Sequence, residues 1–438
     1  MSHASGTPRT DADHPSADRY RAAVQRRTVA VLSAAQVLGG LGVAIGLSVG
    51  GLLAAEVAGT EGVAGLAQTC GVLGAAAAAV PLARLTRRHG RRAGLTTGLL
   101  IGALGAAVVV AATALRALPL LFAGLSLFGA ATAAGLQARY GATDLAEPRR
   151  TARALATVVW ATTVGAVLGP NLAEPAGRLA GAVGLPPLTG PYFVSLVGFS
   201  CAAAVLFALL RPDPLWLADP ERATAGGARP RPAGLWATLT VIAARPRALV
   251  GLVAIVAAHV AMVSVMVMTP VHMHHDGVAL SLIGLVVSVH ILGMYGLSPL
   301  TGWLADRAGR VPVVVGGALL CALAALVSGS APGHDAVLLG IGLFLLGLGW
   351  SCGLVAGSTL LSESVPTADR TSAQGVSDLV MNGSAAIGGS LAGVVVAVSS
   401  YGWLAFGTAV LMIGVALYSA ALIRAATPRA GRGKRAGP

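Results

Sequence analysis

Charge is scarce in this chain: Asp, Glu, Lys and Arg together make up only 11% of its 438 residues. A soluble globular domain carries about a quarter of such residues, so the low charge excludes an ordinary water-soluble protein. Aromatic residues are also few, at 4%. Any binding cavity is therefore expected to be lined mainly by small aliphatic side chains.

Cysteine is scarce as well, and each of the four cysteines stands alone within an apolar stretch: Cys70, Cys201, Cys321 and Cys352. Their spacing is unlike that of a metal-binding motif, so we expect them to be small core residues. Walker loops, dinucleotide-binding fingerprints and nucleophile elbows are absent from any strand–turn–helix context. The sequence therefore predicts neither an enzyme nor a bound cofactor.

Apolar residues are abundant: they make up 55% of the chain, and the mean hydropathy is +0.78. They gather in long runs, and a bilayer core requires roughly 20 apolar residues per spanning helix. The runs are too long and alternate too little for barrel strands. We count twelve of them, near 29–54, 62–83, 93–115, 118–141, 152–173, 191–211, 248–270, 279–301, 311–331, 335–361, 373–397 and 401–424. The predicted fold class is an all-α integral membrane protein with twelve transmembrane helices.

The net charge of +13 raises the possibility of a nucleic-acid partner, but the placement of the arginines argues against one. When the twelve runs are alternated across a bilayer, the basic clusters all fall on the same side. This is the positive-inside pattern, which predicts a multi-pass protein of the cell membrane with both termini in the cytoplasm. The partners expected are the lipid bilayer, a small molecule and protons.

A proline-rich segment divides the chain into two halves that repeat in outline. GWLADRAGR (302–310) corresponds to ARLTRRHGR (83–91), and Arg150-Thr151 corresponds to Arg370-Thr371. Two six-helix repeats are typical of transporters with a central binding site. We expect a disordered cytoplasmic tail (1–28), a first bundle (29–211), a cytoplasmic linker (212–247), a second bundle (248–424) and a basic tail (425–438).

The loop motif, its degenerate copy and the paired layout resemble the major facilitator superfamily over about residues 29–424. GAVLGP, with Gly165, Gly169 and Pro170, resembles the helix-5 motif of the drug/proton antiporters, the multidrug-efflux branch of that superfamily. The glycine pair that follows this motif in the family is missing here. Leu125 also stands where many relatives have a membrane-embedded arginine that is tied to proton coupling.

This resemblance implies a gate built on the charged segment. Asp306 would cap the start of the helix near Thr151 in the opposite half, while Gly302 and Gly309 allow close packing and a tight turn. Arg307 and Arg310 would pair with nearby acids or carbonyls. Further gating candidates near the same side are Arg139, Asp144 and Arg150, with Asp144 pairing either with Arg139 or with Arg150. The alternative is a static loop that is capped for stability.

Polar residues at membrane depth usually mark function. Gln374, Asp378 and Asn382 recur every four residues and share one helix face. Asp378 is the deepest carboxyl and the first candidate for a proton or cation site, because burial favours the neutral form that a proton carrier must adopt; a packing hydrogen bond is the alternative. Other candidates for proton or substrate contact are Gln36, Gln68, His290 and Glu174. His290 could titrate in the pathway, as could His259, but for both residues a packed, neutral histidine is the preferred interpretation.

MTPVHMHHDG, residues 268–277, contains His272, His274 and His275. These side chains are weak candidates for a metal site, and a solvated outer loop or pH-sensitive rim is preferred.

Together, these features predict a monomeric secondary transporter that exports hydrophobic or amphipathic small molecules by proton-coupled alternating access, an antiporter that carries out efflux. The alternatives are uptake, metal-ion or metabolite transport by the same fold, or a membrane sensor that transports nothing.

Overall fold

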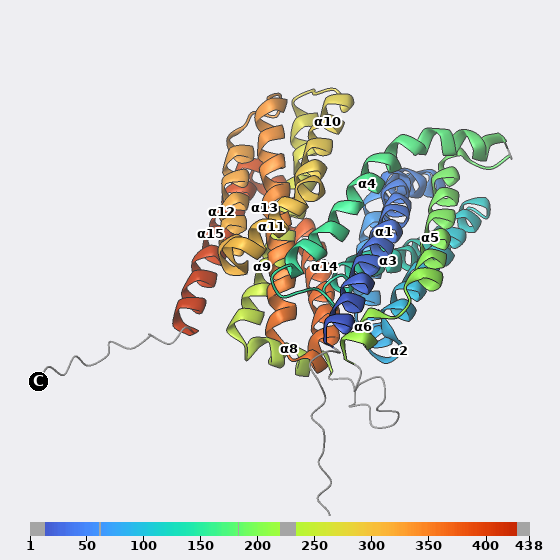
Figure 1. Cartoon of the computed structure of the whole chain (residues 1–438). Helices are drawn as coiled ribbons and strands as arrows, with labels where there is room; N and C mark the ends of the chain where they lie inside the picture. Colours follow the sequence, from blue (N-terminus) through green and yellow to red (C-terminus); the bar gives the residue numbers. More distant parts are fainter. Residues whose placement is uncertain (1–13, 61–62, 183, 220–233, 427–438) are drawn as a thin grey trace, which may run out of the picture.

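The computed structural model describes residues 14–60, 63–182, 184–219 and 234–426, and these residues form helices joined by short connections (Figure 1). The predicted all-α class is confirmed. The first part of the chain contributes five long helices: α1 (His14–Ala58), α2 (Ala64–Ala114), α3 (Leu118–Gly141), α4 (Thr151–Ala182) and α5 (Gly190–Leu209).

Helix α2 contains two membrane crossings rather than one. A straight helix of 51 residues would be about 75 Å long, more than twice the thickness of a bilayer core. At Gly90 the backbone adopts φ 90°, which breaks the helix, and glycine tolerates this conformation. The two arms pack on each other, because the side chain of Leu82 lies against Gly98 and that of Thr86 lies against Gly94.

The second part of the chain contains seven more α-helices: α9 (Pro246–His275), α10 (Leu280–Ile291), α11 (Ser298–Ala308), α12 (Arg310–Ser330), α13 (Ala336–Ser364), α14 (Thr367–Val398) and α15 (Tyr401–Ala426). A π-helical turn over Leu292–Gly296 joins α10 to α11, and the three elements form one crossing. Eleven helices in the described residues are long and apolar enough to span a membrane when α2 is taken as one. With its two arms counted separately, the twelve predicted crossings are confirmed.

Three segments differ from what the sequence analysis expected. Residues 268–275, for which a solvated outer loop or rim was preferred, form the last turns of α9. Residues 14–28, assigned to a disordered tail, belong to α1. The charged segment 302–310 was expected to be a tight turn, but Gly302–Ala308 continues α11 and only Gly309 leaves the helix, with φ 96°. Two short helices, α6 (Pro214–Ala218) and α8 (Leu235–Ala243), lie in the segment expected to be the linker.

The buried apolar side chains form two large clusters. One is built from residues of α1–α5, and the other is built mainly from α9–α15. In Figure 1 the two groups of helices meet at the end that carries α6, α8 and the start of α1, and they diverge toward the opposite end. We call the first the arginine-rich end, since Arg91, Arg139, Arg150 and Arg310 lie there, and the second the far end.

Small residues allow the helices within a group to pack backbone to backbone, as is typical in lipid. Gly129 of α3 lies against Gly71 and Ala75 of α2, and a Cβ at residue 129 would collide with both. Gly414 of α15 has open space around it.

We predict that Gly129→Ala lowers the thermal stability of the detergent-solubilised protein, because overpacking a helix contact costs about 1–3 kcal/mol. Gly414→Ala is the matched control and should leave the unfolding midpoint unchanged or slightly raised, since alanine favours helix. Equal midpoints for the two variants would contradict the tight α2–α3 contact.

Candidate functional site

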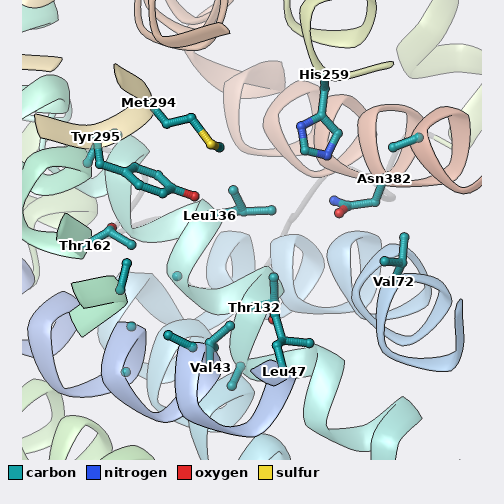
Figure 2. A pocket seen from close by; sticks show the side chains of 18 of the residues that line it. Val43, Leu47, Val72, Thr132, Leu136, Thr162, His259, Met294, Tyr295 and Asn382 are labelled. Atoms are coloured by element: carbon teal, nitrogen blue, oxygen red, sulfur yellow. The ribbon is translucent and has the colours of Figure 1, made fainter. Parts of the chain in front are cut away.

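A cavity of about 840 Å³ lies between the two groups of helices. Figure 2 shows side chains from both groups pointing into it, and most of these side chains are apolar. Among the described residues that line the cavity, Arg139 is the only one that is an Asp, Glu, Lys or Arg. A cavity of this size and polarity fits a small, mostly apolar molecule.

Neutral polar groups stand at separate points of the cavity wall. The Gln36 side chain of α1 donates from Nε2 to Thr162 Oγ1 of α4 at 2.9 Å, which joins two helices of the first group. Asn382 of α14 donates from Nδ2 to the carbonyl of Asp378 at 2.8 Å. Within the described residues, neither amide oxygen has a hydrogen-bond donor, and Gln68 of α2 also lines the cavity.

Aromatic residues form part of the wall on the side of the second group. The indole Nε1 of Trp350 donates to His259 Nδ1 at 2.9 Å. The Tyr295 ring packs edge to face on Trp350, with ring centroids 5.5 Å apart. Figure 2 shows His259 and Tyr295 facing the interior of the cavity, with Met294 beside them. Trp350 itself is only 2% exposed, so it lies behind the two side chains that it contacts.

A buried ion pair closes the cavity toward the arginine-rich end. Arg139 of α3 donates from Nη2 to Asp378 Oδ1 of α14 at 2.7 Å, and both side chains are almost completely buried. The guanidinium also donates to the Tyr140 hydroxyl and to the Leu136 carbonyl. The second carboxylate oxygen, Oδ2 of Asp378, is buried and has no hydrogen-bond partner among the described residues.

A second buried contact joins the two groups nearer the same end. Arg91, which directly follows the Gly90 break, forms two hydrogen bonds with Asp144, at 2.8 and 3.0 Å. It also donates to Gln374 Oε1 of α14 at 2.9 Å, and Gln374 in turn donates to Ser362 at 3.1 Å. The guanidinium of Arg91 therefore bridges both helix groups.

These contacts correct the expected pairing of Asp144. The sequence analysis proposed either Arg139 or Arg150 as its partner, but Asp144 pairs with Arg91. Arg139 instead reaches Asp378, and the exposed side chain of Arg150 lies 3.7 Å from that of Glu147. Sequence proximity misled here, because each buried arginine meets a residue more than fifty positions away.

Asp306 makes the expected contact with the opposite group. Its two carboxylate oxygens accept hydrogen bonds from the backbone amides of Ala152 and Arg153, at 3.1 and 3.0 Å, at the start of α4. A carboxylate at this position satisfies free N–H groups and matches the positive end of the helix dipole. Its gating role remains a prediction.

Other residues of the charged segment hold Asp306 in place. Arg310 contacts Asp306 at 3.1 Å and Glu363 at 3.0 Å, and it donates to the Pro148 carbonyl at 2.9 Å. Gly302 packs against Ala156 of α4. Arg307 is exposed and lies over the Trp303 ring, so its expected pairing with an acid or a carbonyl is replaced by a ring contact.

The remaining candidates divide between the cavity and other places. His290 does not line the cavity: it is fully buried, and its Nδ1 lies 2.7 Å from the Leu343 carbonyl. Glu174 is exposed and lies 3.6 Å from Arg178. Gly165 and Gly169 let α4 pack against the backbone of α1, and Pro170 lines the cavity.

The outer histidines are spread over different contacts. His272 stacks on Tyr401, with ring centroids 4.6 Å apart, and its Nε2 lies 3.2 Å from the Ala331 carbonyl. His274 and His275 are exposed. Within residues 14–60, 63–182, 184–219 and 234–426, no group of three or more His, Cys, Asp or Glu side chains is arranged to hold a metal ion.

The sequence analysis did not identify Thr162, Tyr295 and Trp350 as part of the cavity. For His259 it preferred a packed, neutral histidine over a residue of the transport pathway. All four line the cavity. A single histidine or tryptophan in an apolar run gives no periodic signal for a cavity. The scarcity of aromatics was the one available hint, since a few rings in a chain with so few of them are expected to matter.

Comparison with known proteins gives a family. A profile of the Major Facilitator Superfamily matches residues 32–281 and also residues 252–438. The uncharacterized MFS-type transporter YdeG of Bacillus subtilis (strain 168) is 41% identical over 376 residues, which cover 86% of this chain and 87% of that protein. The riboflavin transporter RfnT of Brucella anthropi is 29% identical over 400 residues, covering 90% of this chain and 95% of that protein.

The fold agrees with solved structures. The proton:xylose symporter XylE, bound to 6-bromo-6-deoxy-D-glucose, matches with a TM-score of 0.73 at 15% identity, covering 91% of this chain and 96% of that chain. These relatives support the superfamily rather than its drug-efflux branch. Because the family profile covers most of the sequence and YdeG is 41% identical over most of its length, the chain belongs to the Major Facilitator Superfamily of secondary transporters.

Proposed function

We propose that this chain exports uncharged hydrophobic or amphipathic small molecules in exchange for protons. The observation that carries the proposal is the mostly apolar cavity between the two helix groups. Among its described lining residues, Arg139 is the one Asp, Glu, Lys or Arg, and its charge is neutralised by Asp378. A charged substrate would need a compensating charge there, whereas an apolar molecule would not. The GAVLGP segment of α4 supports export through its resemblance to the antiporter motif.

The positive-inside pattern supports a cytoplasmic location for the arginine-rich end. In this orientation the buried contacts close the cytoplasmic side, and the helices diverge toward the outside. The segments 29–211 and 248–424 would then move as two units about the cavity, with 212–247 as the linker. Release of a bound molecule to the outside would occur from this conformation.

Asp378 is the proposed proton site. Its Oδ1 is held by Arg139, while its Oδ2 is buried without a partner in the described chain. A proton on Oδ2 would neutralise the carboxylate and weaken the ion pair that joins α3 to α14. Because breaking a buried pair costs about 3–5 kcal/mol, protonation from the outside would favour opening of the cytoplasmic end.

We predict that Asp378→Asn abolishes coupling but not binding. In proteoliposomes, movement of the uncharged probe N-phenyl-1-naphthylamine by the wild-type protein should be accompanied by proton counterflow, read with an internal pH dye. The variant should move the probe down its own gradient with proton counterflow reduced at least tenfold. Glu147→Gln, which removes an exposed acid at the same end, is the control. Normal counterflow in Asp378→Asn would rule out this proton site.

We predict that Asp306→Asn shifts the protein toward the conformation open at the arginine-rich end. Asparagine offers one acceptor where the carboxylate offers two, so the start of α4 should lose about 1–2 kcal/mol of stabilisation. Spin labels at residues 149 and 308 would report the separation of α4 and α11. A distance distribution identical to that of the wild type would leave Asp306 as a static cap.

Riboflavin is a second candidate substrate. RfnT is a riboflavin transporter by name and aligns over most of its length, and the cavity wall with His259, Tyr295 and Trp350 is aromatic, as suits a planar ring system. Riboflavin flux in the same proteoliposomes, together with loss of that flux on Tyr295→Ala, would support this candidate. If the protein moves N-phenyl-1-naphthylamine but not riboflavin, riboflavin is eliminated as a substrate.

A further inference from the structure

The two walls of the cavity differ in the size of their side chains. The wall formed by α1 and α3 combines small residues with the aliphatic side chains of Val43, Leu47 and Leu136, the small ones being Gly39, Gly40, Ala131, Ala134 and Gly135. The wall formed by α9, α13 and the π-helical turn carries larger, polarisable groups: His259, Met262, Met266, Met294, Tyr295 and Trp350. A molecule held between these walls would contact small and aliphatic groups on one side and rings and thioethers on the other. This arrangement fits a flat molecule.

The hydrogen bond from Trp350 fixes the tautomer of His259. Indole nitrogen only donates, so Nδ1 of His259, 2.9 Å away, must be the acceptor. An imidazolium has no acceptor nitrogen, so the ring is neutral and its proton is on Nε2. Nε2 has no hydrogen-bond partner in the described part of the chain, and the ring faces the cavity (Figure 2). His259 therefore presents an N–H donor to any bound molecule.

Trp350 also positions Tyr295. The rings of Tyr295 and Trp350 meet edge to face at an interplanar angle of 81°, and the Tyr295 hydroxyl points toward the middle of the cavity (Figure 2). Since Trp350 is only 2% exposed, it contributes little contact surface of its own. Its effect on a ligand is exerted through the donor of His259 and the ring of Tyr295, so it is a positioning residue.

We propose that the cavity selects uncharged, planar conjugated molecules that carry a ring carbonyl, with the carbonyl oxygen accepting from His259 Nε2–H. The ring system lies between the small residues of α1 and α3 and the ring of Tyr295, where aromatic and sulfur contacts favour a flat π-system. The proposal rests on the proposed transport of uncharged molecules and adds the shape and the hydrogen-bonding group of the substrate.

Three probes separate the two requirements. 9-Fluorenone is planar and has a ring carbonyl, fluorene is equally planar without one, and cyclododecanone has a carbonyl but is not planar. Binding to the purified full chain in detergent micelles is measured by calorimetry, with empty micelles as the reference. Fluorenone should bind about fivefold to tenfold more tightly than fluorene, as expected for one net hydrogen bond, and also more tightly than cyclododecanone.

Variants at the proposed donor test the assignment. His259→Phe should remove the preference for fluorenone over fluorene while fluorene affinity is kept. His259→Gln should retain a preference, because its amide can accept from Trp350 and still donate into the cavity. Trp350→Phe should reduce the preference to less than twofold. His274→Phe and Trp403→Phe are the matched controls, since both residues are exposed outside the cavity, and they should keep the wild-type ratio.

The outcomes distinguish this inference from the transport proposal. Equal binding of the three probes by the wild-type protein, or an undiminished preference in His259→Phe with a normal unfolding midpoint, would overturn the inference. N-phenyl-1-naphthylamine flux would be unaffected by that result. Failure of that flux, with the fluorenone preference intact, would instead overturn the transport proposal. If His259→Phe does not fold, loss of the preference in Trp350→Phe supports the inference and its persistence overturns it.

Discussion

The ion pair between Arg139 and Asp378 is the contact on which the described conformation depends. Removing two charges from water costs several kcal/mol for each ion, and here the cost is offset only while α3 and α14 meet. The pair therefore links the protonation state of one carboxylate to the closure of one end of the cavity. It also neutralises Arg139, the one Asp, Glu, Lys or Arg residue of the described cavity lining, which is the basis for the proposed preference for uncharged molecules.

The other contacts at the arginine-rich end reinforce this closure by different physical means. On one side a carboxylate, Asp306, satisfies the free amides at the start of α4. On the other side a guanidinium, Arg91, is neutralised by Asp144 and reaches the neutral amide of Gln374. The related segments 302–310 and 83–91 thus close the same end. The first does so through Asp306 at a helix terminus, and the second through the buried Arg91. In the proposed transport cycle each contact would separate when this end opens, so closure would be cooperative.

Much of the fold follows from the sequence, because spanning helices need long apolar runs and the runs are plain to see. The depth of Asp378 was predictable from its position within an apolar run, and the reach of Asp306 to the start of α4 was implied by the resemblance of the loop motif to the major facilitator superfamily. The partners of Arg91 and Arg139 were not predictable, since helical periodicity gives the face of a residue but not the helix that this face meets. The surroundings of His259 were not predictable either, because they involve Trp350, 91 residues away, and a cavity that exists only when both groups of helices are assembled.

The central claim is that the two ends of the cavity open in alternation and that the Arg139–Asp378 pair holds one of them shut. Pulsed EPR tests this directly with two label pairs, residues 149 and 308 at the arginine-rich end and residues 56 and 275 at the far end, in wild-type protein and in Asp378→Asn. The account predicts that the variant lengthens the first distance and shortens the second in the same sample. Lengthening at one end without shortening at the other, or no change at either end, would contradict it.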